Sequence, residues 1–337
     1  MADLKTTYMG VQLKNPIILG ASSIVDKLET VKKIERAGVG AIVYRSLFEE
    51  QIHLEEAQLD DMLGEYDERN AEMVDIFPNI KHAGAKEHLY QLKKTVDAID
   101  VPVFASLNAI YDSTWIEYAK QLEETGVAGV ELNFYSVPVE LEKTGASIEE
   151  HQLSILRKVK KAVKIPVSVK ISSFYSNPLN FVQQLDKAKT DAVVLFNRFF
   201  QPEINIETEE FYYPFDLTHE KDYQVTLRFA GLLYGQIKGD ICASRGISDG
   251  KDLIKMLLAG ATTVQVVSTI FRNKAGYVTK MLDTLEQWMD EKGYKTVDEF
   301  RGKLAMKNLK EPYAYKRAQY VDILMNSTEI IKKYPMI

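Results

Sequence analysis

Short apolar segments alternate with longer amphipathic ones along most of this chain. Eight apolar segments have the length and composition of buried strands, and they begin near residues 17, 41, 101, 128, 165, 191, 239 and 263. Strands that are apolar at almost every position are typical of parallel sheets, in which both faces are covered. Each segment is followed by sequence with helical spacing. Between residues 28 and 37, for example, Val31, Ile34 and Ala37 fall on one helical face. The pattern predicts eight consecutive βα units.

The eight units favour an α/β fold, a single (β/α)₈ TIM barrel over about residues 15–291. An open, doubly wound sheet is the alternative, but no G-x-G-x-x-G sequence follows the first predicted strand. Residues 6–13 predict a small hairpin ahead of the barrel, and residues 292–337 predict two further helices packed on its outside. We therefore expect the whole chain, residues 1–337, to form one domain.

Three connections are too long for simple βα loops. They follow the second, fourth and sixth predicted strands and cover residues 47–86, 134–147 and 197–221. The last of them is rich in aromatic residues and predicts a β-ribbon. Loops at the C-terminal ends of barrel strands build the active sites of this fold. The three long loops therefore place the expected site at that end of the barrel.

Composition and charge exclude several classes of function. The chain has 42 basic and 48 acidic residues and a net charge of −6, which disfavours nucleic-acid binding. Its single cysteine, Cys242, lies in an apolar strand, so we expect a small buried hydrophobe rather than a disulfide or a metal ligand. No signal-peptide pattern and no uncharged apolar run of about 18 residues is present. We expect a cytoplasmic protein without a membrane span.

Amides, cations and hydroxyls occupy the predicted strand ends, and no carboxylate does. The candidate residues are Ala21, Ser22, Ser23, Arg45, Ser46, Ser106, Asn108, Asn133, Lys170, Ser172, Asn197, Arg198, Ser244, Arg245, Gly246, Ser268 and Thr269. Such a set suits neither a divalent metal, which prefers carboxylates or histidine, nor a glycosidase, which needs two carboxylates. It suits a planar, polar, anionic ligand, because amides pair with ring carbonyl and N–H groups.

Two polar turns follow the seventh and eighth predicted strands, in the unit from Gly239 to Arg272. One contains Ser244, Arg245 and Gly246, and the other contains Ser268 and Thr269. Free backbone N–H groups beside a helix N-terminus bind anions, and an arginine can bond a phosphate through two nitrogens. The two turns therefore predict a phosphate site, with ordinary βα turns as the alternative.

Simpler interpretations exist for several of these side chains. Asn133 and Asn197 could be turn formers, as asparagine often is. Lys170 could be a rim lysine in a salt bridge, and Arg45 could pair with the glutamates that closely follow it. Glu131, inside the fourth strand, is expected to form a structural ion pair.

The chain resembles the dihydroorotate dehydrogenase family of flavin barrels, most closely its soluble class 1 branch, over roughly residues 4–290. The resemblance rests on the segments NPIILGASS, VYRS, VELNFYSVP, IPVSVKIS, VVLFN and ASRGISDGKDLIKMLLAGATTVQVVSTIF. In that family FMN sits at the barrel mouth with its phosphate on the last two turns, and dihydroorotate passes a hydride to the flavin. The resemblance implies an FMN-dependent oxidoreductase that converts dihydroorotate to orotate in pyrimidine biosynthesis.

Carried over by position, the resemblance also implies roles for single residues. Cofactor contacts would come from Ala21, Ser22, Ser46, Asn108, Asn133, Lys170, Asn197, Ser244, Arg245, Gly246, Ser268 and Thr269. The first two would lie against the isoalloxazine ring, and the last four would hold the phosphate. Lys170 would stabilise the negative charge of the reduced flavin, which makes it a catalytic residue.

The substrate side of the site has its own implied residues. Asn133 would touch both flavin and substrate, Asn197 would bond the substrate ring, and Asn70 would be a further substrate contact. Arg45 stands where the family has a lysine and would act in substrate binding and catalysis. Ser136 would be the base that removes the proton from C5 of the substrate.

Several segments depart from the family pattern. NAEMVDIFPN at residues 70–79 replaces the N-S-x-G-x-x-N segment that wraps orotate, and Y-S-V-P at residues 135–138 replaces S-C-P-N. Arg245 replaces the first glycine of the phosphate turn. Two alternatives therefore stay open. They are an FMN oxidoreductase acting on another small cyclic amide or carboxylate, and a flavin-free barrel that binds a phosphorylated metabolite.

The electron acceptor and the partners are less constrained by the sequence. With one cysteine and no iron–sulfur motif, the chain offers no ligand set for a cluster of its own. Fumarate, a quinone, oxygen and a partner protein are all compatible with it. By analogy with class 1 we expect a homodimer.

Overall fold

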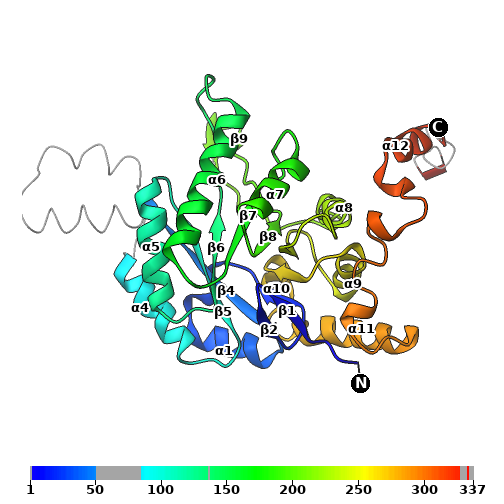
Figure 1. Ribbon diagram of the computed structural model, residues 1–337, viewed down its shortest axis with the longest axis horizontal. Coiled ribbons are helices and arrows are strands. Elements are labelled where there is room, and N and C mark those ends of the chain that lie inside the picture. The colour runs from blue at the N-terminus through cyan, green and yellow to red at the C-terminus, as the bar shows by residue number, and fades with distance from the viewer. Residues whose placement is uncertain (1, 51–84, 136, 327–331, 334–337) are drawn as a thin grey trace, which may run out of the picture.

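Eight parallel strands close into a barrel in the computed structural model, which describes residues 2–50, 85–135, 137–326 and 332–333 (Figure 1). The strand order is β11-β12-β3-β4-β5-β6-β7-β8. The strands are β3 (Ile17–Leu19), β4 (Ala41–Phe48), β5 (Val103–Asn108), β6 (Gly129–Asn133), β7 (Val167–Ile171), β8 (Ala192–Leu195), β11 (Asp240–Ala243) and β12 (Thr263–Val266). The predicted TIM barrel is confirmed, and the open sheet is excluded because β12 pairs with β3.

Helices follow the strands and cover the outside of the barrel (Figure 1). They are η1 (Ser23–Asp26), α1 (Leu28–Arg36), α4 (Ala85–Val96), α5 (Asp112–Glu124), α6 (Gly145–Ala162), α7 (Pro178–Lys187), α8 (Gln224–Leu233), α9 (Gly250–Ala259), α10 (Ser268–Asn273) and α11 (Tyr277–Lys292). All of these helices except η1 and α10 bury two or more apolar residues on one side; α1 does so with Val31 and Ile34, as its periodicity predicts. The helix α9 ends at Gly260, whose φ of +117° lies in the left-handed region that favours glycine.

The predicted N-terminal hairpin, β1 (Thr6–Tyr8) and β2 (Val11–Leu13), closes one end of the barrel. The hairpin residues Tyr8, Met9 and Leu13 belong to the same buried cluster as strand residues from inside the barrel, among them Cys242. The backbone N–H of Met9 donates to Asp240 at the start of β11, over 2.7 Å. Cys242 is fully buried, as predicted, and burial raises the pKa of its thiol to about 12. The open end of the barrel is therefore the opposite one, where the strands finish.

A short antiparallel ribbon, β9 (Glu203–Asn205) with β10 (Glu210–Tyr212), follows β8 and confirms the prediction for that long connection. All six ribbon residues are exposed. The connection after β4 contains residues 51–84, which lie outside the described residues, and Asn70 lies among them.

The C-terminal extension differs in detail from the two packed helices that we predicted. Its described part contains the 3₁₀ helices η2 (Val297–Glu299), η3 (Met306–Asn308) and η4 (Tyr313–Tyr315), and then α12 (Arg317–Met325). Gly302, at a φ of +70°, and Pro312 interrupt the segment before a longer helix can form. The N-terminal part of the extension packs on α9, where Gly302 N donates to Leu257 O, whereas α12 buries no residue.

None of the helices in the described ranges is both long enough and apolar enough to cross a membrane.

Candidate active site

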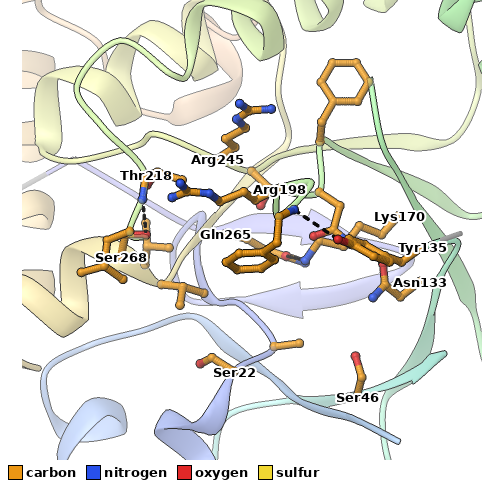
Figure 2. A pocket seen from close by; sticks show the side chains of 18 of the residues that line it. Ser22, Ser46, Asn133, Tyr135, Lys170, Arg198, Thr218, Arg245, Gln265 and Ser268 are labelled. Carbon is orange, nitrogen blue, oxygen red and sulfur yellow. Dashed lines mark hydrogen bonds between the residues drawn. The ribbon is translucent and has the colours of Figure 1, made fainter. Parts of the chain in front are cut away.

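A cavity of about 610 Å³ opens at the C-terminal ends of the barrel strands (Figure 2). Its volume lies within the roughly 300–1,000 Å³ of small-molecule and cofactor sites. Most of the candidates from the strand ends line it, namely Ala21, Ser22, Ser23, Arg45, Ser46, Asn133, Lys170, Asn197, Arg198, Ser244, Arg245, Gly246 and Ser268. The barrel thus brings together side chains that lie up to 247 residues apart in sequence, from Ala21 to Ser268.

Among the described residues, two of the predicted site residues, Asn108 and Thr269, do not line the cavity. The side-chain nitrogen of Asn108 donates to the backbone carbonyl of Asn133 over 3.0 Å, and Thr269 is 2% exposed. The Thr269 hydroxyl donates to the backbone carbonyl of Ser248 over 2.7 Å. Asn70 and Ser136 lie outside the described residues.

The predicted polar turn at residues 268–269 is the beginning of α10. Ser268 faces the cavity, where its hydroxyl accepts a hydrogen bond from the backbone N–H of Thr218 over 3.1 Å (Figure 2). The side chain of Thr269 turns to the loop that precedes α9 instead. Adjacent residues at a helix start point in different directions, so only one of the two hydroxyls reaches the cavity.

Three buried polar side chains form the floor of the cavity, and we call them the floor triad: Glu131 on β6, Lys170 on β7 and Gln265 on β12. Lys170 Nζ donates to Gln265 Oε1 over 2.9 Å and lies 3.4 Å from Glu131 Oε1. Gln265 Nε2 donates to Glu131 Oε2 over 2.5 Å. The expected ion pair of Glu131 is confirmed, and Lys170 both makes a salt bridge and faces the cavity.

The two asparagines meet on one side of the cavity. Asn197 Nδ2 donates to Asn133 Oδ1 over 2.7 Å, although the residues belong to different βα units (Figure 2). The backbone N–H of Asn197 is held by Ile171 O at 2.8 Å. Side-chain amides fixed in this way present donors and acceptors in defined directions, which suits a ring with carbonyl and N–H groups.

Two arginines occupy another part of the cavity wall, near Ser268 (Figure 2). Arg245 Nε and Arg198 Nη1 are buried and have no hydrogen-bond partner among the described residues. A buried guanidinium N–H without an acceptor is costly, so this wall is suited to an anion that supplies one. Both arginines are among the strand-end candidates of the sequence, but the family resemblance implied a role only for Arg245.

Arg45 also lines the cavity, and it forms a salt bridge with Asp26. Its Nε is 3.3 Å from Asp26 Oδ1 on η1, and its side chain is 27% exposed. Glu49, one of the partners considered from the sequence, accepts hydrogen bonds from Tyr111 N at 2.9 Å and from the Thr114 hydroxyl at 2.8 Å. The Asp26 pair holds one edge of the guanidinium and leaves its other nitrogens for a ligand.

Aromatic side chains from the long loops complete the wall. The rings of Tyr135 and Phe199 stack with centroids 5.2 Å apart, and those of Phe200 and Phe215 stack at 5.6 Å. The Tyr135 hydroxyl accepts from the backbone N–H of Phe200 over 3.1 Å, which ties the loop after β6 to the loop after β8. The aromatic-rich sequence of residues 197–221 predicted a loop with many rings at this end of the barrel, but it did not show which rings reach the cavity.

Comparison with known protein families matches residues 3–289 to the family described as dihydroorotate dehydrogenase. Among similar proteins, a dihydroorotate dehydrogenase B (NAD(+)) catalytic subunit of Thermoplasma volcanium is 25% identical over 315 residues, 90% of this chain and 98% of the relative. The protein of the same name from Methanocaldococcus jannaschii is 25% identical over 317 residues, 89% of this chain and 97% of the relative. A putative dihydroorotate dehydrogenase A (fumarate) of Aeropyrum pernix is 24% identical over 235 residues, 66% of this chain and 74% of the relative.

The matched range spans the barrel and every residue that lines the cavity. The chain therefore belongs to the dihydroorotate dehydrogenase family, a family of generally flavin-dependent oxidoreductases that act on CH–CH bonds.

Proposed function

We propose that this protein is an FMN-dependent dehydrogenase that oxidises dihydroorotate to orotate. One observation carries the proposal: a single cavity contains the buried ammonium of Lys170 in its floor and, in its wall, two buried arginine nitrogens that have no acceptor in the described part of the chain. A flavin mononucleotide has a phosphate at one end and a ring that becomes negatively charged on reduction at the other. The two cationic places suit these two groups.

The residues present fit this cofactor. Arg198, Arg245 and Ser268 would hold the phosphate, and the small side chains of Ala21 and Ser22 would leave room for the ring. Bound FMN would supply the acceptor for a hydride. The protein would supply a fixed positive charge at the floor of the cavity, which costs no reorganisation when negative charge develops on the ring.

The substrate would be held by the amide pair and by an arginine. Asn133 and Asn197 offer oriented amides to the substrate ring, and Arg45 offers a guanidinium to its carboxylate. Oxidation of dihydroorotate removes a proton from C5 and a hydride from the neighbouring carbon. We assign the proton to Ser136 and a further ring contact to Asn70, both outside the described residues.

A visible spectrum followed by anaerobic titration tests the proposal. The purified protein should be yellow, and its flavin absorbance should bleach when dihydroorotate is added without oxygen. A yellow protein that keeps its absorbance at millimolar dihydroorotate would reject this substrate, and a screen of other cyclic amides and small carboxylates would follow. A colourless protein that takes up no FMN would favour a flavin-free barrel that binds a phosphorylated metabolite.

Assembly is a separate part of the proposal. We infer a cytoplasmic homodimer of this chain, by analogy with the class 1 branch. Two of the relatives named above are called catalytic subunits, which supports an additional electron-accepting partner. Light scattering of the purified protein should give twice the chain mass. If dihydroorotate still bleaches the flavin but no small electron acceptor is reduced, a partner protein that accepts the electrons is missing.

A further inference from the structure

Gln265 occupies the central place in the floor triad, and neither the cofactor nor the substrate roles above account for it. It is 3% exposed and lies on β12, the last strand of the barrel. Lys170 can only donate hydrogen bonds, and the Glu131 carboxylate can only accept them. Gln265 is the member of the triad that can do both. Its amide orientation is therefore fixed, with the oxygen toward Lys170 at 2.9 Å and the nitrogen toward Glu131 at 2.5 Å.

The triad links strands that are not neighbours. The strands of Glu131 and Lys170, β6 and β7, pair with each other, but β12 is separated from β7 by β8 and β11. Gln265 therefore reaches both partners across the interior of the barrel, at the cavity floor; Figure 2 shows it beside Lys170. All three residues are at most 8% exposed, so water cannot easily replace a lost partner.

The geometry also determines how far the charge of Lys170 is neutralised. The ammonium makes its hydrogen bond to the neutral amide oxygen of Gln265 and lies farther, at 3.4 Å, from the carboxylate of Glu131. The carboxylate in turn receives its hydrogen bond from the amide nitrogen. Gln265 thus keeps the two charges close but prevents a tight ion pair, so part of the positive charge remains directed into the cavity.

We propose that Gln265 is a positioning residue that sets how strongly Lys170 stabilises the reduced flavin. This inference rests on the FMN-dependent function proposed above. Without the amide, the ammonium would approach Glu131, and its effect on the ring would weaken. Without the carboxylate charge, the same ammonium would act on the ring uncompensated.

The reduction potential of bound FMN, measured by anaerobic dye equilibration at mildly alkaline pH, where the reduced ring keeps its negative charge, tests this without using turnover. In Gln265→Met we expect the redox equilibrium of bound FMN to shift about tenfold toward the oxidised form. The reduction potential would then be about 30 mV lower, since two electrons are transferred. This change is on the scale of one hydrogen bond to a charged group. In Gln265→Glu the potential should also fall, because two carboxylates then flank one ammonium. In Glu131→Gln it should rise instead.

Thr263→Val is the matched control, since Thr263 is buried on the same face of β12, two residues before Gln265. Its potential should stay at the wild-type value. Opposite shifts for the Gln265 and Glu131 variants, with an unchanged control, support the proposal. Shifts of the same sign, or no shift, overturn it, because damage to packing alone has no reason to reverse sign. If Gln265→Met does not fold, Gln265→Glu decides.

Failure of the proposed function would be visible separately, as wild-type protein that binds no flavin. The positioning role is then tested in crystals of the flavin-free protein. Gln265→Met should move Lys170 Nζ toward Glu131, and an unmoved ammonium would reject the role.

Discussion

At the scale of single residues, Arg245 combines an unfavourable backbone with a useful side chain. Its φ of +78° lies in the left-handed region, which costs a residue with a side chain about 1–2 kcal/mol. The resemblance to the family places a glycine here, and a glycine would avoid that cost. Arg245 instead lines the cavity with a buried nitrogen that has no acceptor within the described ranges. The strain is therefore accounted for if the side chain binds an anion.

Two substitutions separate these contributions. Arg245→Gly should raise the free energy of unfolding by about 1 kcal/mol, because the backbone strain is relieved. Its dissociation constant for FMN should rise by about tenfold, because one charge-assisted hydrogen bond is lost. Arg245→Ala should lose the same affinity without gaining stability. Chemical denaturation and FMN titration measure both quantities, and unchanged affinity in both variants would remove Arg245 from the phosphate site.

His88 makes stability depend on pH. It is fully buried on α4, its ring lies edge-on to Tyr44 with centroids 5.4 Å apart, and neither ring nitrogen has a hydrogen-bond partner among the described residues. Burial, with a smaller contribution from Arg45, lowers the pKa of His88 from 6.5 to about 3. Below pH 6.5 the unfolded chain therefore binds a proton that the folded chain does not, and stability is lost as the pH falls.

Between pH 6.5 and pH 5 this loss should reach about 2 kcal/mol. We expect His88→Leu to lack that part of the pH dependence, because leucine cannot titrate. Urea denaturation of both proteins at the two pH values provides the measurement. Parallel losses in wild type and variant would show that other groups cause the acid sensitivity.

At the scale of elements, the strands were predictable and the side-chain contacts between distant strands were not. Each barrel strand begins within two residues of its predicted start, because a buried parallel strand is a continuous apolar run with clear ends. Their strand-end positions predicted that Asn133 and Asn197 belong to one site, but not that the two side chains bond each other. The bond between Glu131 and Gln265 spans 134 residues and depends on the closure of the barrel, so no local pattern contains it. Thr269 shows the same limit, because a helix start replaced the predicted turn and rotated its hydroxyl away from the cavity.

The pairing of β3 with β4 requires a glycine at position 40. Gly40 N donates to Ile17 O over 2.7 Å, and a Cβ on Gly40 would lie 2.2 Å from the backbone oxygen of Asn15. Gly40→Ala should therefore lower the free energy of unfolding by about 1–3 kcal/mol, since the backbone must move. Gly276→Ala is the control, because nothing lies within 4 Å of its added Cβ and its φ is −60°. Equal stabilities of the two variants in denaturant titrations would contradict this reading.

At the scale of the whole molecule, the closed barrel has one end filled by the β1–β2 hairpin and the cavity at the other. A ligand that binds only the folded state stabilises the whole cooperative unit. FMN at about 100 times its dissociation constant should contribute about 2.7 kcal/mol, which corresponds to a rise in Tm of about 4 °C for a chain of this length. Differential scanning calorimetry with FMN and with riboflavin measures it. A rise of equal size with riboflavin would show that the phosphate site contributes nothing.

The pairing of β12 with β3 also orders events while the chain is being made on the ribosome. The strand β12 carries Gln265, Ser268 follows it, and both are synthesised after the other seven strands of the barrel. A nascent chain that ends before residue 263 leaves β3 and β11 as open sheet edges, which are prone to pair with other chains. Such a chain also lacks one member of the floor triad. We therefore expect a truncated product to aggregate and to lack part of the proposed cofactor site. Uptake of flavin would then mark a chain whose translation has passed the final strand.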